Sequence, residues 1–246
     1  EYKIDIRFSH VPTSNANIKV NIGVENDVDY DQLIAKLNGI ETVIFAGGIS
    51  ASLEGEEMPV NIPGFMGGDR TDIELPAVQR AFLKKLHEAG KKVVFVNFSG
   101  SAMGLVPETQ SCDAILQAWY PGEEGGRAIA DVLFGDYNPS GKLPVTFYKN
   151  VSQLPDFKDY SMQGRTYRYM TEDPLYCFGY GLSYTTFSIG QASVSKSVLS
   201  AKDASDNITI TIPVANTGKR DGTEVVQVYV RRPEDLAGPR KSLRGY

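Results

Sequence analysis

The chain has 246 residues, 41% of them hydrophobic and 22% charged, a composition typical of a folded globular protein with one large domain or two smaller ones. Its 25 basic and 30 acidic side chains give a net charge of −5, without the basic excess of nucleic-acid binders or the polybasic segments that bind anionic membranes. No apolar stretch approaches the roughly 18 residues that a membrane span requires. Two cysteines cannot form a disulfide framework, and His10 and His87 are too far apart to indicate a His-based metal site.

The first third of the chain predicts a hairpin followed by alternating helices and strands. Residues 1–24 alternate apolar and polar side chains around a turn region, as a β-hairpin does. A short helix is expected over 30–37, a buried strand over 43–46, a long Gly-rich loop over 49–74 and an amphipathic helix over 75–89. The apolar row of that helix is predicted to be Leu75, Val78, Phe82, Leu86 and Ala89.

The middle of the chain continues the same alternation. Strands over 93–96 and 114–119 are apolar on both faces, and a helix is expected over 123–134. This order predicts an α/β fold, a three-layer α/β/α sandwich with a mostly parallel sheet. Binding crevices in such sheets lie beyond the carboxyl ends of the strands. The loops that leave these ends begin at Gly47, Asn97 and Tyr120.

The last third changes character. Residues 148–186 are rich in aromatic side chains, which we interpret as packing rather than as a platform for sugars. Alternation over 208–214 and 223–230 then predicts β-strands, and two strands alone are not stable in water. A partial all-β sandwich of the immunoglobulin or fibronectin-III kind is therefore expected after the α/β part.

The densest group of charged candidates lies in the loop over 49–74. Glu54, Glu56 and Glu57 stand together and are followed by Asp69-Arg70. Crowding and partial burial raise a carboxyl pKa toward neutrality, as a general acid needs. A solvated acidic loop without chemistry is the alternative interpretation. No Gly-rich phosphate-binding motif occurs in the chain.

Three segments, 114–126, 131–147 and 178–187, together with 53–75, resemble the second catalytic domain of glycoside hydrolase family 3 and the start of its fibronectin-III-like domain. The resemblance implies a partner barrel domain with an Asp nucleophile, whereas the α/β sandwich lends the acid/base Glu of a retaining mechanism. The family pattern E-x-E-x-x-D-R falls on Glu54 and Glu56, with Asp69-Arg70 displaced by an insertion. Glu56 is thereby predicted as the acid/base, Glu54, Asp69 and Arg70 as substrate-binding residues, and no cofactor or metal is implied.

The resemblance also divides the chain and predicts its role. Residues 1–24 resemble the end of a PA14-like insertion, 25–186 the family's α/β sandwich domain, and 187–246 a truncated fibronectin-III-like domain. The implied protein is a fragment of an exo-acting β-glycosidase that removes terminal β-linked xylose or glucose from oligosaccharides, with β-xylosidase-type members most similar. Its partners would be the oligosaccharide and the barrel domain of the same protein, not nucleic acid or a membrane, and its location periplasmic or secreted. The alternative is a non-catalytic carbohydrate-binding or docking module that reuses the sandwich fold.

Overall fold

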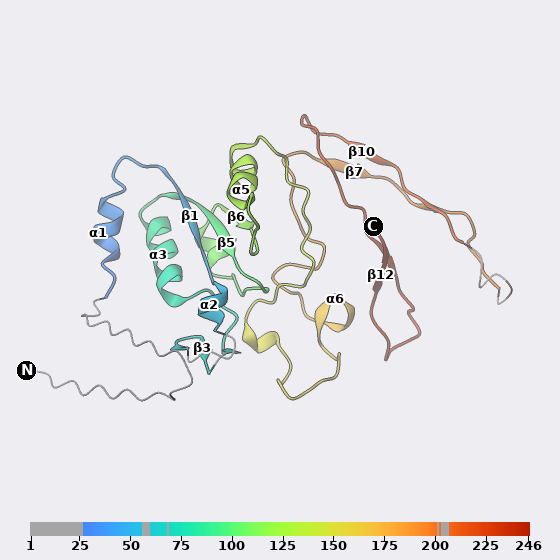
Figure 1. Cartoon of the computed structure of the whole chain (residues 1–246). Coiled ribbons are helices and arrows are strands. Elements are labelled where there is room, and N and C mark those ends of the chain that lie inside the picture. Colours follow the sequence, from blue (N-terminus) through green and yellow to red (C-terminus); the bar gives the residue numbers. More distant parts are fainter. Residues whose placement is uncertain (1–26, 56–59, 68, 201, 203–206) are drawn as a thin grey trace, which may run out of the picture.

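The computed structural model of the chain describes residues 27–55, 60–67, 69–200, 202 and 207–246 (Figure 1). The hairpin predicted over 1–24 lies outside these residues. Within the described ranges, no helix is long and apolar enough to cross a membrane.

A three-stranded parallel sheet forms the centre of the α/β part. Its strands are β1 (Thr42–Gly48), β5 (Lys92–Phe98) and β6 (Ala114–Gln117), with β5 in the middle. Gly48 aligns with Phe98, and Asn97 aligns with Gln117, so that all three carboxyl ends meet at one edge of the sheet. The predicted parallel arrangement is confirmed. β6 ends two residues earlier than expected, because Trp119 has a positive φ of 56° that turns the chain out of the sheet.

Helices lie on both sides of this sheet but cover one face only in part. Figure 1 shows α1 (Tyr30–Ala35) and α3 (Ala77–Glu88) on one side and α5 (Gly125–Phe134) on the other. The three predicted helices are therefore present and form the outer layers of the predicted sandwich. Ile44, in the strand predicted to be buried, is 48% exposed, and Gly125 is the one buried residue of α5. Other short helices of the described residues include α4 (Glu108–Ser111), η1 (Val151–Gln153) and α6 (Thr166–Tyr169).

The buried face of α3 differs from the predicted row. Leu83 and Leu86 are fully buried in the core, and the Phe82 ring meets the Phe45 ring of β1 edge-on at 5.9 Å. Val78, in contrast, is 49% exposed, and Ala89 is also exposed, so the row was wrong at both positions. A polar contact of Gln79 accounts for part of this difference between the predicted and observed buried face.

The Gln79 side chain joins α3 to the carboxyl end of β1. Its amide donates to the Gly48 carbonyl oxygen and accepts from the Gly48 backbone N–H, both at 2.7 Å. Gln79 therefore faces the sheet, and the residue before it, Val78, is turned toward solvent. Hydrophobic spacing alone carries no signal for such an amide contact.

The segment predicted as a loop over 49–74 contains ordered elements. It begins with α2 (Ala51–Glu54), whose N-terminus is capped by the Ser50 side chain. Three two-residue strands follow as an antiparallel meander. They are β2 (Asn61–Ile62), β3 (Phe65–Met66) and β4 (Asp69–Arg70). Phe65, only 2% exposed, anchors this meander in the core.

The C-terminal part is all β, as predicted, but its strands are shorter than expected. Within the described residues they form three antiparallel pairs. These are β7 (Phe187–Ile189) with β10 (Val214–Asn216), β8 (Ser193–Val194) with β9 (Ile210–Thr211), and β11 (Val228–Val230) with β12 (Ser242–Gly245). Figure 1 shows β7 and β10 side by side, extending away from the parallel sheet.

The fold predicts a strict requirement for glycine at the end of β1. Gly48 has a φ of +125°, and a Cβ there would lie 2.0 Å from the Phe98 carbonyl oxygen. Gly48→Ala is expected to lower the free energy of unfolding by more than about 1 kcal/mol, because it adds a backbone clash to an unfavourable φ. Urea unfolding measures this difference.

Gly122→Ala is the matched control for this prediction. A Cβ at Gly122 meets no atom within 4 Å, and its φ is not in the positive range. Equal unfolding midpoints for the two variants would contradict the proposed clash.

Candidate active site at the carboxyl edge of the sheet

The Arg70 guanidinium lies at the carboxyl edge of the parallel sheet and is held by three separate groups. Nη1 donates to Ser101 Oγ at 2.8 Å, Nε donates to the Asp72 carbonyl oxygen at 3.1 Å, and Nη2 approaches Met103 Sδ at 3.4 Å. Burial lowers the pKa of Arg70, and the negative charges of Glu54 and Asp72 oppose that shift. The group stays cationic at neutral pH and is fixed in orientation.

Glu54 is brought to the same place by α2. It is the last residue of that helix, is half-buried, and interacts electrostatically with both Arg70 and Tyr120. Gly55 follows in the left-handed conformation, with a φ of 65°, and ends the helix. The structure thus places Glu54 within electrostatic range of Arg70, and these are two of the four residues predicted for the site.

Of the other two predicted residues, the structure describes only Asp69. Asp69 precedes Arg70 on β4 and has an exposed side chain. Since successive side chains of a strand point to opposite faces, Asp69 faces away from the Arg70 guanidinium. Its role in substrate binding stays a prediction. Glu56, predicted as the acid/base, and its neighbour Glu57 lie outside the described residues, so that assignment also stays a prediction.

Sequence reasoning missed Ser101 and gave Tyr120 only as the start of a loop. The Tyr120 ring lies against Gly100, where a Cβ would be 2.8 Å from Cε2 of the ring. Burial and the charge of Glu54 raise the pKa of Tyr120, while a hydrogen bond with the Gly100 backbone opposes the rise. Both residues follow the carboxyl ends of strands at the same edge of the sheet. That position is the one sequence signal that could have indicated them as site residues.

A chain of buried polar groups connects this cluster to the sheet. Asn97 Nδ2 donates to Gln117 Oε1 at 2.6 Å, and Gln117 Nε2 donates to Ser99 Oγ at 3.0 Å. The Ser99 hydroxyl in turn donates to the Ser101 carbonyl oxygen at 2.8 Å. The chain fixes the backbone at Ser101, whose own hydroxyl accepts from Arg70.

This network gives Ser99 a structural role. Ser99 is fully buried, and its hydroxyl is used in the bonds just described. His87, the one histidine among the described residues, is exposed on α3 and belongs to the last turn of that helix. The described part of the chain thus holds no Ser–His pair at this edge.

Neither cysteines nor metal-ligating clusters contribute to the site. Among the described residues, no group of three or more His, Cys, Asp and Glu side chains is arranged to hold a metal ion. Both cysteines are free thiols. Burial raises the pKa of the Cys112 thiol to about 11, which makes it a poor nucleophile at neutral pH, whereas Cys177 is exposed.

Comparison with known proteins places the chain in a family. Residues 7–184 match the family model described as the glycosyl hydrolase family 3 C-terminal domain. A xylan 1,4-β-xylosidase of Xylanibacter ruminicola is 60% identical over 246 residues, which are 100% of this chain and 28% of that protein. A periplasmic β-glucosidase of Salmonella typhimurium is 43% identical over 190 residues, covering 72% of this chain and 24% of that protein. The chain therefore spans less than a third of the length of either relative.

Solved structures agree with the sequence matches. A β-glucosidase of Bifidobacterium adolescentis superposes with a TM-score of 0.74 at 30% identity, over 88% of this chain and 32% of that one. A β-glucosidase of Erythrobacter marinus superposes with a TM-score of 0.72 at 37% identity, over 88% of this chain and 28% of that one. The parallel sheet, the polar cluster at its edge and these matches lead to one conclusion: the chain belongs to glycosyl hydrolase family 3 and carries the C-terminal domain of that family.

Proposed function

We propose that the chain is part of a retaining, exo-acting β-glycosidase that removes terminal β-linked xylose or glucose from oligosaccharides. The observation that carries the proposal is the joining of Glu54 and Arg70 at the carboxyl edge of the sheet, directly before the acidic segment that contains Glu56. A module used only for docking has no need for a half-buried, oriented guanidinium beside an acidic loop. The names of the relatives, a β-xylosidase and β-glucosidases, support the same reaction class.

The residues divide the work as follows. Glu56 protonates the departing glycosidic oxygen and then removes a proton from the attacking water. An Asp on a barrel domain of the same protein forms the covalent glycosyl-enzyme. Arg70 donates hydrogen bonds to sugar hydroxyls, and Glu54 accepts from them while keeping the local field negative. Asp69 contributes to substrate binding from the exposed face of β4.

The names of the relatives support the proposed substrate and location. The 60% identity to a xylan 1,4-β-xylosidase supports xylose over glucose as the terminal sugar. The 43% identity to a periplasmic β-glucosidase supports a periplasmic or secreted location. We place the boundary between the α/β sandwich domain and the fibronectin-III-like domain at residues 186 and 187.

The isolated 246-residue chain is expected to be nearly inactive. A retaining mechanism needs two carboxyl groups roughly 5–5.5 Å apart, and in this proposal one of them belongs to the barrel domain. Hydrolysis of 4-nitrophenyl β-xyloside by the chain and by the full-length protein measures the difference. Turnover by the chain at roughly 1–1000 per second would contradict the division of roles.

The full-length protein distinguishes the two functional hypotheses. An enzyme releases xylose from xylobiose, and NMR of the first product shows the β-anomer. Binding of xylobiose without hydrolysis would instead support a carbohydrate-binding module and overturn the proposal.

A further inference from the structure

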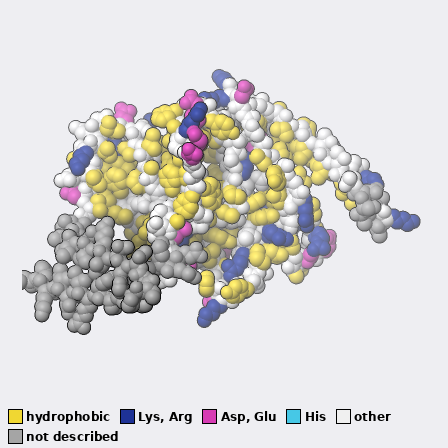
Figure 2. Space-filling model, viewed as in Figure 1, with side chains coloured by type: hydrophobic (Ala, Val, Ile, Leu, Met, Phe, Trp, Pro, Cys, Tyr) yellow, Lys and Arg dark blue, Asp and Glu magenta, His cyan; other side chains and the backbone are white. Residues whose placement is uncertain are grey.

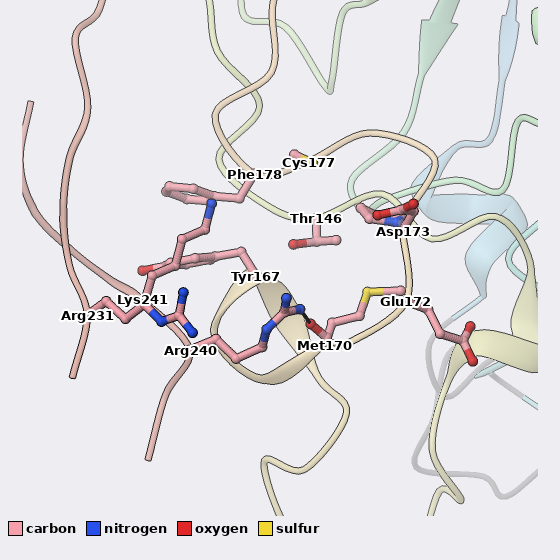
Figure 3. A pocket seen from close by; sticks show the side chains of 11 residues that line it. Thr146, Tyr167, Met170, Glu172, Asp173, Cys177, Phe178, Arg231, Arg240 and Lys241 are labelled. Carbon is pink, nitrogen blue, oxygen red and sulfur yellow. Dashed lines mark hydrogen bonds between the residues drawn. The ribbon is translucent and has the colours of Figure 1, made fainter. Parts of the chain in front are cut away.

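A pocket of about 310 Å³ lies away from the sheet edge, between α6 and the β11–β12 hairpin (Figure 3). Its walls include the side chains of Thr146, Tyr167, Phe178, Arg231, Arg240 and Lys241. None of these residues belongs to the candidate active site. Figure 2 shows Lys and Arg side chains gathered over the region of α6 and β12. The volume is at the lower end of the range for small-molecule sites, which fits one sugar-sized ring.

Three cationic side chains in this pocket are without a carboxylate partner in the described part of the chain. Arg240 donates one guanidinium N–H to the Met170 carbonyl oxygen and keeps its other donors available. Lys241 lies over the Tyr229 ring, with Nζ 4.6 Å from the ring centroid. In Figure 3, Arg231 and Arg240 extend their guanidinium groups on the same side of the pocket. Cations gathered in this way favour an anionic ligand, and Arg binds carboxylates in bidentate geometry.

The neighbouring Arg232, in contrast, has a carboxylate partner. Its guanidinium pairs with the Asp235 carboxylate at 2.5 Å and does not line the pocket. The two adjacent arginines thus differ in pairing, and only Arg231 is directed to the pocket.

The opposite wall offers hydrogen-bonding groups that suit hydroxyls. Thr146 is only 6% exposed, and its Oγ1 has no hydrogen-bond partner. Figure 3 shows this oxygen directed into the pocket, with Asp173 next to Thr146 and the Glu172 carboxylate turned outward. Buried hydroxyls are almost always hydrogen-bonded, so Thr146 Oγ1 indicates a place for a ligand oxygen.

An apolar surface lies between the two polar walls. The Tyr167 and Phe178 rings stack with centroids 4.5 Å apart and an interplanar angle of 22°. The Tyr167 hydroxyl accepts from the Leu243 backbone N–H at 3.3 Å, which fixes the ring against β12. Rigid aromatic rings of this kind contact the C–H face of a sugar.

We propose that this pocket binds a hexuronate, a sugar ring that carries one carboxylate. The carboxylate lies on Arg231 and Arg240, ring hydroxyls meet Thr146 and Asp173, and the C–H face lies on the Tyr167–Phe178 pair. The negative charge of Asp173 disfavours a phosphate dianion and leaves a monovalent carboxylate as the better fit. The proposal does not depend on the glycosidase mechanism, because no residue is shared with the candidate active site.

Titration of the 246-residue chain with D-glucuronate, D-glucose and inorganic phosphate tests the proposal. Calorimetry is expected to show glucuronate binding at least roughly tenfold more tightly than glucose, which carries a neutral hydroxymethyl group in place of the carboxylate. Arg231→Gln is expected to weaken glucuronate binding about tenfold, whereas Arg232→Gln changes it less than about twofold. Both arginines are exposed, so neither substitution threatens folding.

Alkylation of Cys177 provides a second readout. Cys177 is exposed and lines the pocket, so bound glucuronate is expected to slow its reaction with iodoacetamide, as followed by mass spectrometry. Glucuronate binding no tighter than glucose, equal losses in the two arginine variants, or no protection of Cys177 would each overturn the proposal. Phosphate binding as tight as glucuronate would show a simple anion patch instead and would also overturn it.

Discussion

If the proposed function holds, Glu56→Ala in the full-length protein is expected to lose about 10²–10⁴-fold of its activity on xylobiose, the range that general acid–base catalysis contributes. In a natural disaccharide the leaving sugar would depart as a strongly basic alkoxide, so cleavage depends on protonation of the glycosidic oxygen. The leaving group of a dinitrophenyl glycoside is a stable phenolate that needs little protonation. The glycosylation step on this substrate is therefore expected to be much less affected. Steady-state and burst kinetics on the two substrates measure this contrast.

The same variant also lacks the base for the second step. The covalent intermediate is therefore expected to accumulate with activated substrates, and added azide restores turnover because it needs no proton removal. Glu54→Ala and Glu57→Ala are the internal controls. Azide rescue of either control, without rescue of Glu56→Ala, would move the acid/base role to that neighbour. Rescue of none would leave the loop as a solvated acidic surface.

Arg80→Met is expected to lower the free energy of unfolding of the chain by about 3–5 kcal/mol. Arg80 on α3 donates to Glu74 and, at 2.9 Å, to Glu108 on α4. Glu108 is fully buried, and its Oε2 has no hydrogen-bond partner. Removing the cation leaves a buried carboxylate without compensation. Urea unfolding followed by circular dichroism gives the free-energy difference.

Two further variants separate charge from packing. Replacing the pair, as in Arg80→Met with Glu108→Leu, is expected to recover most of the loss, since buried ion pairs exchange well for apolar side chains. Lys84→Met on the same helix removes an exposed pair with Glu88, at 3.7 Å, and is expected to cost about 0.5 kcal/mol or less. A double variant as unstable as Arg80→Met alone would assign the effect to packing.

The α/β architecture could be predicted from the sequence because its signals are long and periodic. The continuous apolar strands β1 and β5 and the twelve-residue helix α3 each exceed the length that pattern reading needs. The two-residue strands of the meander between α2 and α3 do not. A strand of two residues has no measurable alternation, so only the tertiary anchor at Phe65 reveals it.

The site could be predicted only in part, for a related reason. Glu54 and Arg70 were found as charged residues in one loop at a strand end. Ser101 and Tyr120 come from two other loops, and their closeness to Arg70 exists only once the three carboxyl ends are aligned. The proposed hexuronate pocket could not be predicted from the sequence at all. It forms where β12 folds back on α6, and the hydrogen bond that joins these elements links Leu243 to Tyr167 across 76 positions.

The paired contact between Gln79 and Gly48 makes one backbone amide a reporter on the carboxyl edge of the sheet. The Gly48 N–H donates to the Gln79 side chain, so it exchanges with deuterated solvent only when α3 and the end of β1 separate. Its exchange rate therefore measures how often this edge opens, independently of global unfolding. In the full-length protein, binding of a ligand at the neighbouring candidate site would slow hydrogen exchange of that single amide.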